Sequence, residues 1–517
     1  MFRQRKRLRT EQVLLAKLIK MKKVLVLLLT AYCIDSHAQS SLTIAQMVSD
    51  FDTLINNILT ISPQHHVRQK VTGIDIRKNL HLIRDEVFNC KTDAAFLECV
   101  QRALNSCQDG HTSLIRTGYL PSRKDYQEAG LSDQAIDLIP RYDSLWRIDP
   151  ANNRKLFIPL IYLKGEYYCF SSFSAGEKNI KAGSKLVSCN GQSIHRFVQS
   201  LLSYKRMMRW DFERKRYFAE DFFLAANFKG EDSLLLDFVQ PDKKKTRVNL
   251  AFSQVLHFPD TINTSVNQTK KVEYWEKEQL LYIRVPQMSE ADYYPPLIRS
   301  LAANKPVSKV VIDIRDNPGG GDGVWINILG ALIKDTISYT DFILCNNTDA
   351  VKRHFPENAK DWKPYRQKDF IQNNYLIFYS GPSSIQPDSL SILYDGPIYL
   401  LQNENIYSSA GSFSAVAALS SQLISVGNNT GRLLGKGVSP LLFELPSSKI
   451  LYRIEPVIDF LNVKTAADVY HDKVEDKVEL SIDEYLNRLK NKNILYEKDY
   501  LLQKDPVFIK AINMKSK

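Results

Sequence analysis

The sequence predicts an α/β protein whose core is built from βαβ crossovers, preceded by a helical N-terminal domain and a small β domain. Two observations predict the core. Val310 to Ile314 is an almost continuous β-branched run, which is typical of a parallel strand buried on both faces. Along residues 272–485 such strands alternate with helix-compatible segments, and this alternation implies parallel strands joined by crossover helices.

Residues 1–38 have the pattern of a signal peptide for export. Met21-Lys22-Lys23 is a basic start, Val24 to Ala31 is the apolar core, and Ser36-His37-Ala38 fits a small-residue cleavage site. The apolar stretch is too short to span a membrane as a helix. The alternatives are an uncleaved anchor and a lipid on Cys33, and either would attach the protein to a membrane. We expect an exported protein that is periplasmic or associated with the cell envelope.

Much of the positive charge of the chain lies in the same segment. Residues 1–38 hold nine Lys/Arg and two Asp/Glu, a net of +7, which leaves +5 of the total of +12 for the rest. The remaining charges are mixed in sign and lack the aromatic-basic pattern of a nucleic-acid module. We therefore expect no nucleic-acid partner. Residues 1–20 precede a better start at Met21, so they are either a misassigned start or a long basic region.

Six cysteines follow the signal, at positions 90, 99, 107, 169, 189 and 345. No C-x-x-C pair is present, so we expect no metal site and no cofactor. An exported protein permits disulfides, and Cys90, Cys99 and Cys107 lie close enough in sequence for one local bridge. Buried free thiols are the alternative.

Residues 39–125 are predicted to form the helical domain. Apolar residues recur at helical spacing in two stripes, Leu42, Ile44, Met47, Phe51, Leu54 and Ile58, and then Ala94, Phe96, Leu97, Val100 and Leu104. Residues 140–255 are predicted to form the β domain, because strand-like segments alternate there with charged turns. Within it, Asn190-Gly191 is a typical hairpin turn.

Residues 256–490 are predicted to form the α/β core. Residues 340–395 show no clear periodicity and are interpreted as an insertion between core strands, with a lid as one role. Residues 491–517 are basic and are interpreted as a frayed C-terminal tail.

Two small-residue turns in the core indicate hydrolytic chemistry. Gly319-Gly320-Gly321 follows the buried strand at Val310, and its backbone N–H groups can approach a ligand closely. A second strand, Ile398 to Leu401, leads to the pair Ser408-Ser409 at a helix start. A serine at a strand-to-helix turn is where α/β hydrolytic enzymes place a nucleophile. An N-cap serine pair is the structural alternative.

These turns resemble motifs of the C-terminal processing (tail-specific) serine proteases, a family that includes the tricorn core protease and the interphotoreceptor retinoid-binding protein repeats. Asp313-Ile314-Arg315-Asp316-Asn317-Pro318-Gly319-Gly320 is similar to its D-L-R-x-N-P-G-G signature. Tyr407 to Gly411 is similar to its nucleophile segment, although Ser412 stands where the family usually has Glu. Gly427-Asn428-Asn429-Thr430 is similar to the start of the following G-x-x-T-x-G turn.

The resemblance implies the fold of the core and the identity of the β domain. It implies a ClpP/crotonase-like core, with a PDZ domain inserted before it. Gly183 to Ile194 resembles the G-x-x-L-x-x-I-N-G-x-x-I stretch of PDZ domains, which capture C-terminal peptides by strand addition. An unrelated small β domain is the alternative.

The resemblance also implies the site residues. It places the nucleophile at Ser409, with Ser408 as the alternative one position earlier. The expected oxyanion donors are the N–H groups of Gly319 or Gly320 and of Ala410. No metal takes part in this mechanism.

Two residues compete for the role of general base. His111, in Asp109-Gly110-His111-Thr112, matches the D-G-H-T segment of tricorn-like relatives, although Gly110 stands where those enzymes have a serine. Lys436 resembles the lysine of the Ser–Lys branch, but it requires a three-residue insertion after the turn threonine. We therefore favour His111, whose imidazole titrates near neutral pH. The resemblance implies Glu475 as the acid that orients the imidazole, since tricorn-like enzymes use a glutamate near the end of the core, and a surface charge is the alternative.

The sequence thus predicts an exported serine endopeptidase that cleaves extended or C-terminal segments of proteins through Ser409 and His111. A Ser409–Lys436 dyad protease is one alternative. A catalytically inactive relative that binds peptides or small hydrophobic ligands is another. The expected partner is a protein or peptide substrate, and the oligomeric state is left open.

Overall fold

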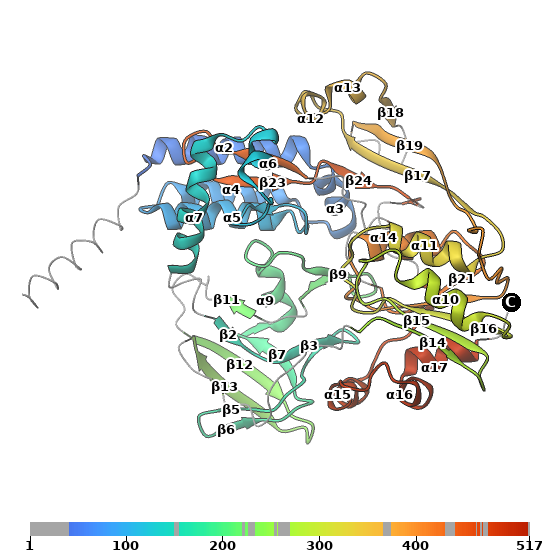
Figure 1. The fold of residues 1–517 in the computed structure, drawn as a ribbon. Coiled ribbons are helices and arrows are strands. Elements are labelled where there is room, and N and C mark those ends of the chain that lie inside the picture. Colours follow the sequence, from blue (N-terminus) through green and yellow to red (C-terminus); the bar gives the residue numbers. More distant parts are fainter. Residues whose placement is uncertain are drawn as a thin grey trace, which may run out of the picture.

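The computed structural model describes residues 41–514 except for 149–154, 220–222, 226–232, 253–255, 257–268, 366–373, 430–439, 462, 466–467 and 469–473. Its core is a six-stranded sheet of order β14-β15-β16-β20-β21-β25 (Figure 1). The strands are Lys271–Trp275 (β14), Leu280–Arg284 (β15), Lys309–Asp313 (β16), Ile398–Gln402 (β20), Leu423–Gly427 (β21) and Asp476–Lys477 (β25). From β15 to β25 neighbouring strands are parallel, whereas β14 is an antiparallel edge strand. The central strands are buried along almost their whole length, as their continuous apolar runs predict.

Three crossover helices cover one face of this sheet, Tyr294–Ala302 (α10), Gly323–Leu332 (α11) and Ser409–Ala417 (α14). Their apolar residues, including Trp325 and Phe413, share one buried cluster with strands β15, β16 and β20. The rings of Trp325 and Phe413 stack at 5.5 Å between centroids, which joins α11 to α14. Because both helices begin just after a strand ends, their N-termini meet at one edge of the sheet. The candidate site lies at this edge.

The C-terminal region contains three helices, Ile482–Lys490 (α15), Lys498–Gln503 (α16) and Pro506–Asn513 (α17). Val507, Phe508 and Ala511 of α17 are buried against the other face of the core sheet, where Phe508 contacts the rings of Trp275 and Tyr282. The expectation of a frayed tail over 491–517 is therefore wrong for residues 498–513. The apolar residues of this short helix follow helical spacing, and covering the sheet removes them from water.

Residues 340–395 lie between core strands β16 and β20, as an insertion would, but the described ones form regular strands and short helices. Two long strands, Ile337–Asn346 (β17) and Tyr375–Ile385 (β19), form an antiparallel pair in a sheet of order β18-β19-β17-β24. The other strands are Lys363–Tyr365 (β18) and Val457–Asp459 (β24), and two short helices, Asp349–His354 (α12) and Pro356–Ala359 (α13), lie between β17 and β18. Ile343, Cys345 and Leu376 of this sheet are buried against the N-terminal helices.

The N-terminal region is helical, as predicted, but it extends beyond residue 125. Its helices are Ile44–Ile61 (α2), Gln64–Thr72 (α3), Ile76–Val87 (α4), Asp93–Ser106 (α5), Arg123–Glu128 (α6) and Asp133–Ile148 (α7). Between α5 and α6, strand Ser113–Leu114 (β1) pairs with Leu451–Ile454 (β23), which also pairs with Leu441–Glu444 (β22). Strand β1 of the N-terminal region therefore joins a sheet with β22 and β23, and the N-terminal helices share a hydrophobic core with distant parts of the chain.

The middle of the chain forms a separate β domain that begins at residue 155, after α7. Its main sheet has the antiparallel order β13-β12-β7-β4-β3, with β8 paired to β7. The elements are Lys155–Phe157 (β2), Leu160–Leu163 (β3), Glu166–Cys169 (β4), Phe173–Ala175 (β5), Lys178–Ile180 (β6), Lys185–Cys189 (β7), Gln192–Ser193 (β8), Ile194–Ser200 (α9), Arg209–Asp211 (β9), Arg216–Phe218 (β10), Phe223–Ala225 (β11), Ser233–Val239 (β12) and Lys245–Ala251 (β13). This domain has its own hydrophobic core.

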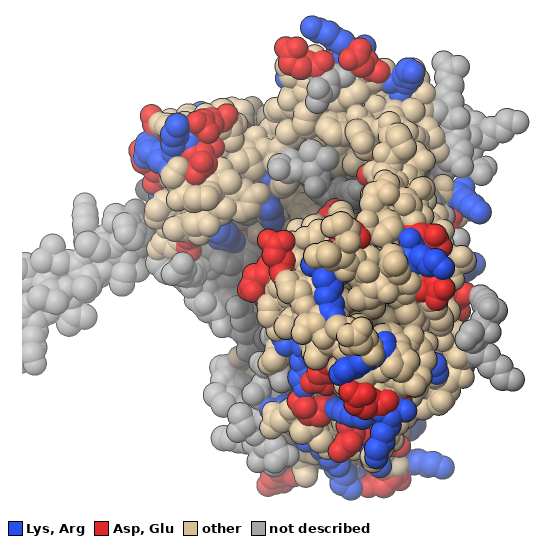
Figure 2. All heavy atoms as spheres, turned by 45° about the vertical axis from the view of Figure 1, so that its right-hand side comes forward, with Lys and Arg blue, Asp and Glu red and all other residues tan. Residues whose placement is uncertain are grey.

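Figure 2 shows basic and acidic side chains interspersed over one face of the molecule. Among the described residues, no helix is both long and apolar enough to cross a membrane. The same residues contain no group of His, Cys, Asp and Glu side chains arranged to hold a metal ion. All six described cysteines are buried free thiols, and the Sγ atoms of Cys90 and Cys99 lie 3.8 Å apart. The local disulfide considered from the sequence is thus not formed here.

Candidate active site

Ser409 is the first residue of α14, at a turn with a strained backbone. The preceding residue, Ser408, has φ 52° and ψ −124°, a conformation that L-residues rarely adopt. Ser409 is buried, and its Oγ donates a hydrogen bond of 2.6 Å to Oδ1 of Asp322 at the start of α11. The same carboxylate oxygen accepts a hydrogen bond of 3.1 Å from Nε1 of Trp325. The hydroxyl of Ser409 therefore lies between the N-termini of two helices.

The glycine turn packs directly against the serine turn. Gly319 and Gly320 have φ values of 104° and 139°, which favour glycine. A Cβ added at Gly319 would lie 2.7 Å from both Cβ of Ser408 and the carbonyl oxygen of Tyr407. This close approach explains why the two small-residue turns occur together.

The expected oxyanion donors differ in availability. The N–H of Gly319 donates to Oδ1 of Asn317 at 2.8 Å, and that of Ala410 donates to the carbonyl of Tyr407 at 3.2 Å. The N–H of Gly320 has no hydrogen-bond partner among the described residues. Ser409 adds a backbone N–H at the first position of α14, where a helix leaves its donors unpaired. Gly320 and the N-terminus of α14 are thus the donors open to an oxyanion.

His111 lies in a loop that its neighbours hold in place. Its backbone N–H donates to Oδ1 of Asp109 at 3.2 Å, and Oγ1 of Thr112 donates to Oδ2 of Asp109 at 2.8 Å. The imidazole packs beside the ring of Tyr407, with 5.6 Å between ring centroids. A side chain at position 110 would collide with the Tyr407 ring, which explains the glycine that precedes His111.

The carboxylate next to His111 is Glu455, in the turn between β23 and β24. Oε2 of Glu455 lies 3.5 Å from Nδ1 of His111. The N–H of Glu455 donates to Oγ1 of Thr112 at 3.2 Å, so the two loops are tied together. Glu455 is 2 % exposed. Burial, followed by the nearby charge of Asp109, raises the pKa of Glu455 well above its usual range.

The pKa of His111 moves in the opposite direction. Burial lowers the pKa of the imidazole below its ordinary value of 6.5, and the charges of Arg453 and Arg206 add to this effect, whereas Asp109 opposes it. The pKa shifts of His111 and Glu455 both favour uncharged groups.

Tyr407 brings the histidine loop to the serine turn, since it contacts His111 and lies two positions before Ser409. In this structure, however, the Ser409 hydroxyl donates to Asp322, and no hydrogen bond joins it to His111 among the described residues. Glu475, the acid expected from the sequence, is exposed, and its N–H donates to the carbonyl of Ser425 at the edge of the core sheet. Lys436 lies outside the described residues.

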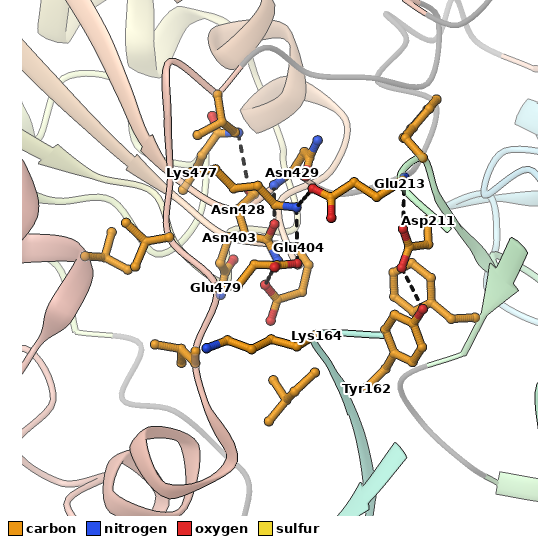
Figure 3. Close-up of a pocket in the computed structure, with 18 of the residues that line it drawn as sticks. Tyr162, Lys164, Asp211, Glu213, Asn403, Glu404, Asn428, Asn429, Lys477 and Glu479 are labelled. Atoms are coloured by element: carbon orange, nitrogen blue, oxygen red, sulfur yellow. Dashed lines mark hydrogen bonds and ion pairs between the residues drawn. The ribbon is translucent and has the colours of Figure 1, made fainter. Parts of the chain in front are cut away.

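A pocket of about 230 Å³ lies between the middle β domain and the carboxyl ends of β20 and β21 (Figure 3). Its β-domain wall includes Tyr162, Lys164 and Asp211, and its core wall includes Asn403 and Glu404 among other polar residues. Lys477 of the core forms an ion pair with Glu213 of the β domain, which joins the two walls. Neither Ser409 nor His111 lines this pocket.

Sequence reasoning missed two acids of the site, Asp322 and Glu455. Asp322 directly follows the glycine turn, and that position is the signal that could have identified it. Glu455 lies between two apolar strands, in Ile454-Glu455-Pro456-Val457, where a carboxylate is unusual. Its pairing with His111, however, depends on the contact between β1 and β23, which are more than 300 residues apart.

Comparisons with known proteins find a matching family model and solved structures of similar fold. Residues 279–459 match the model of peptidase family S41. The fold is similar to that of mature CPAF, with a TM-score of 0.51 and 11% identity over 90% of this chain and 99% of that chain. The structure of mature CPAF complexed with lactacystin has the same TM-score and identity, over 87% of this chain and 98% of that chain. The photosystem II D1 C-terminal processing protease gives a TM-score of 0.35 and 12% identity over 84% of this chain and 94% of that chain. No curated protein sequence matches the chain.

Proposed function

Because residues 279–459 form a domain of peptidase family S41, a serine-peptidase family, we propose that this protein is an endopeptidase with Ser409 as nucleophile and His111 as general base. The observation that carries the proposal is the meeting of three segments at Tyr407: the serine turn, the glycine turn and the histidine loop. Proteins and peptides are the substrate class of such an enzyme, and extended or C-terminal segments are the proposed cleavage sites.

In the proposed reaction, the Ser409 side chain rotates away from Asp322 and toward His111. The imidazole takes the hydroxyl proton while Oγ attacks the peptide carbonyl carbon. The N–H groups of Gly320 and α14 stabilise the oxyanion of the tetrahedral intermediate. The imidazolium then returns the proton to the leaving amine, and water hydrolyses the acyl-enzyme by the same steps in reverse order. Glu455, whose Oε2 lies 3.5 Å from Nδ1 of His111, orients the imidazole.

A second assignment of the base is favoured by the hydrogen bond of 2.6 Å between Ser409 and Asp322. In that case the carboxylate would accept the proton directly. His111 remains the stronger proposal, since histidine is the side chain that most often serves as a general base near neutral pH. Lys436 is the third alternative.

Substitutions at the serine pair and at the candidate bases test the proposal, with fluorescein-labelled casein as substrate. Ser409→Ala should lower kcat by roughly 10⁶-fold, as removal of a serine nucleophile does elsewhere. Ser408→Ala should retain most activity, and a fluorophosphonate should label Ser409 in the wild type. His111→Ala should cost nearly as much as Ser409→Ala. Loss of activity in Asp322→Ala or Lys436→Ala, with His111→Ala still active, would reassign the base.

A matched pair of glutamate substitutions tests the orienting acid. Glu455→Gln should lower kcat by about 10⁴-fold, the effect of disturbing the acid that orients a catalytic histidine. Glu475→Gln should leave kcat unchanged, because Glu475 is exposed at the edge of the core sheet. The reverse result would restore Glu475 to the role expected from the sequence. A wild-type protein that neither cleaves casein nor reacts with the fluorophosphonate would favour the inactive binding protein.

We further propose that the protein is exported and that its middle domain docks peptides. The first proposal rests on the N-terminal signal pattern, and a mature N-terminus at Gln39 would support it. The second rests on the antiparallel sheet with β3 at its edge and on the PDZ-like sequence from Gly183 to Ile194. Binding of C-terminal peptides to the full-length Ser409→Ala protein, and not of the same peptides with amidated ends, would support peptide docking.

A further inference from the structure

We propose that Asp316 is a positioning residue that fixes the glycine turn relative to the serine turn. The C-terminal region, through its hydrogen bonds to Asp316, helps to hold the two turns in place. This inference rests on the proposed function. We use the name Asp316 junction for Asp316 together with Asn403, Asn405, Arg488 and Tyr496.

Asp316 stands at the start of the segment that forms the glycine turn. It has φ 62°, a strained conformation for a residue with a side chain, and it lies three positions before Gly319. Its N–H donates to Oδ1 of Asn403 at 2.9 Å. The next residue, Asn317, holds the N–H of Gly319 through its side chain and accepts the N–H of Tyr407 with its carbonyl at 3.1 Å. The conformation at Asp316 thus sets the path of both turns.

One oxygen of the Asp316 carboxylate is bound to the loop that carries the nucleophile. Oδ1 accepts hydrogen bonds from Nδ2 of Asn403 and from Nδ2 of Asn405, both at 2.8 Å. These asparagines lie six and four positions before Ser409, between β20 and α14. The carboxylate therefore links the glycine segment to the serine segment by direct side-chain bonds.

The other carboxylate oxygen of Asp316 is bound to helix α15 and to the turn between α15 and α16. Oδ2 accepts from Oη of Tyr496 at 3.1 Å and from Nη2 of Arg488 at 3.2 Å. The ring of Tyr496 covers the buried guanidinium of Arg284 at 4.1 Å, which fixes the ring in place. Arg488 and Tyr496, which lie 172 and 180 positions further along the chain, therefore supply the remaining hydrogen bonds to the Asp316 carboxylate.

The middle β domain reaches the same junction. Nη2 of Arg209, on β9, donates to Oδ1 of Asn405 at 2.8 Å, and Arg209 is buried. Asn403, labelled in Figure 3, lines the pocket between this domain and the core, and Arg488 lines the same pocket. Four parts of the chain therefore meet at one carboxylate: the glycine segment, the serine segment, the C-terminal helices and, through Asn405, the β domain.

The charge and the acceptor geometry of Asp316 are both required by this arrangement. A carboxylate accepts at both oxygens, whereas an asparagine in its place would turn an NH₂ group toward two of the four donors. The lost bonds would leave the turns free to shift, and a displacement of about 1 Å at a reacting group can cost on the order of 100-fold in rate.

The test uses the full-length protein and three variants. Asp316→Asn removes the charge at constant size, and Tyr496→Phe removes one hydroxyl. Asp93→Asn is the matched control, because Asp93 is a buried carboxylate bound to an arginine, Arg141, and to a hydroxyl, that of Ser41 at 2.9 Å, in the N-terminal helices. For each variant, kcat and KM on labelled casein, the rate of fluorophosphonate labelling and the melting temperature are measured.

We expect Asp316→Asn to lower kcat and the labelling rate by about 100-fold with little change in KM, and Tyr496→Phe to lower both by a smaller factor. Asp93→Asn should lower only the melting temperature. The inference is overturned if Asp316→Asn and Tyr496→Phe behave like Asp93→Asn while the wild type is active and Ser409→Ala is not. Absence of casein cleavage and of labelling in the wild type would instead overturn the proposed function, and this inference with it.

Discussion

The chemistry of single residues in this site is set mainly by burial. Burial favours the uncharged form of an acid and of a base alike, so it raises the pKa of Glu455 and lowers that of His111. A neutral imidazole is the form that accepts a proton from serine. The imidazole of His111 therefore stays uncharged, and able to accept a proton, at a pH where an exposed histidine would already be partly charged.

This shift predicts the pH dependence of hydrolysis. Since the pKa of His111 lies below 6.5, the imidazole stays neutral to lower pH, and kcat/KM should fall only as the pH drops below 6.5. A profile of kcat/KM on labelled casein from pH 4 to 9 measures the acid limb. An acid limb well above pH 7 would contradict the prediction and point to a lysine base.

At the scale of elements, the site depends on the close approach of the glycine turn to its neighbours. Gly319 touches the serine turn, and Gly320 lies against the carbonyl of Met288, in the segment after β15. Gly321 has open space around its Cβ position and no positive φ. The three consecutive glycines are therefore not equivalent.

Substitution of each glycine by alanine tests this difference. Gly319→Ala and Gly320→Ala should each lower kcat by on the order of 100-fold, because an added methyl forces the turns apart by a fraction of an ångström or more. Gly321→Ala should leave kcat nearly unchanged and serves as the control. Steady-state hydrolysis of labelled casein measures the effect. Equal losses in all three variants would mean that flexibility, rather than close packing, is what the turn requires.

In the whole molecule, two contacts join the N-terminal and C-terminal regions to parts of the chain that are distant in sequence. Strand β1, which follows the N-terminal helix α5, forms a sheet with β23 and β22. The C-terminal helix α17 covers one face of the core sheet. Both contacts join segments that are far apart in sequence. The catalytic core is therefore not complete without the two ends of the described chain.

A pair of large-to-small substitutions measures how much α17 contributes to stability. Phe508 is fully buried against Trp275 and Tyr282, so Phe508→Ala should lower the free energy of unfolding by about 3–5 kcal/mol. Leu390 is 65% exposed, so Leu390→Ala should change the free energy of unfolding by no more than about 0.5 kcal/mol. Urea unfolding followed by circular dichroism gives both values. A small effect of Phe508→Ala would restore the view of a dispensable tail.

Much of the core was predictable because its signals are local. The buried strands β16 and β20 are continuous apolar runs, and the glycine and serine turns follow them directly in the sequence. The long pair of β17 and β19 was missed, since its stability comes from pairing and from packing on the N-terminal helices rather than from a regular alternation. Helix α17 was missed because it is short and basic at its end.

Local sequence patterns are enough to predict the strand-to-turn segments of the core, the glycine motif and the candidate serine, because backbone sterics and residue size act between near neighbours. The acids beside His111 and Ser409, in contrast, follow from the tertiary fold. Glu455 reaches His111 because Ser113 pairs with Arg453 across β1 and β23, and Asp322 reaches Ser409 because α11 and α14 begin at the same edge of the sheet. Such contacts depend on strand pairing and helix packing between residues that are 87 or more positions apart in the sequence. A local sequence pattern therefore does not predict them.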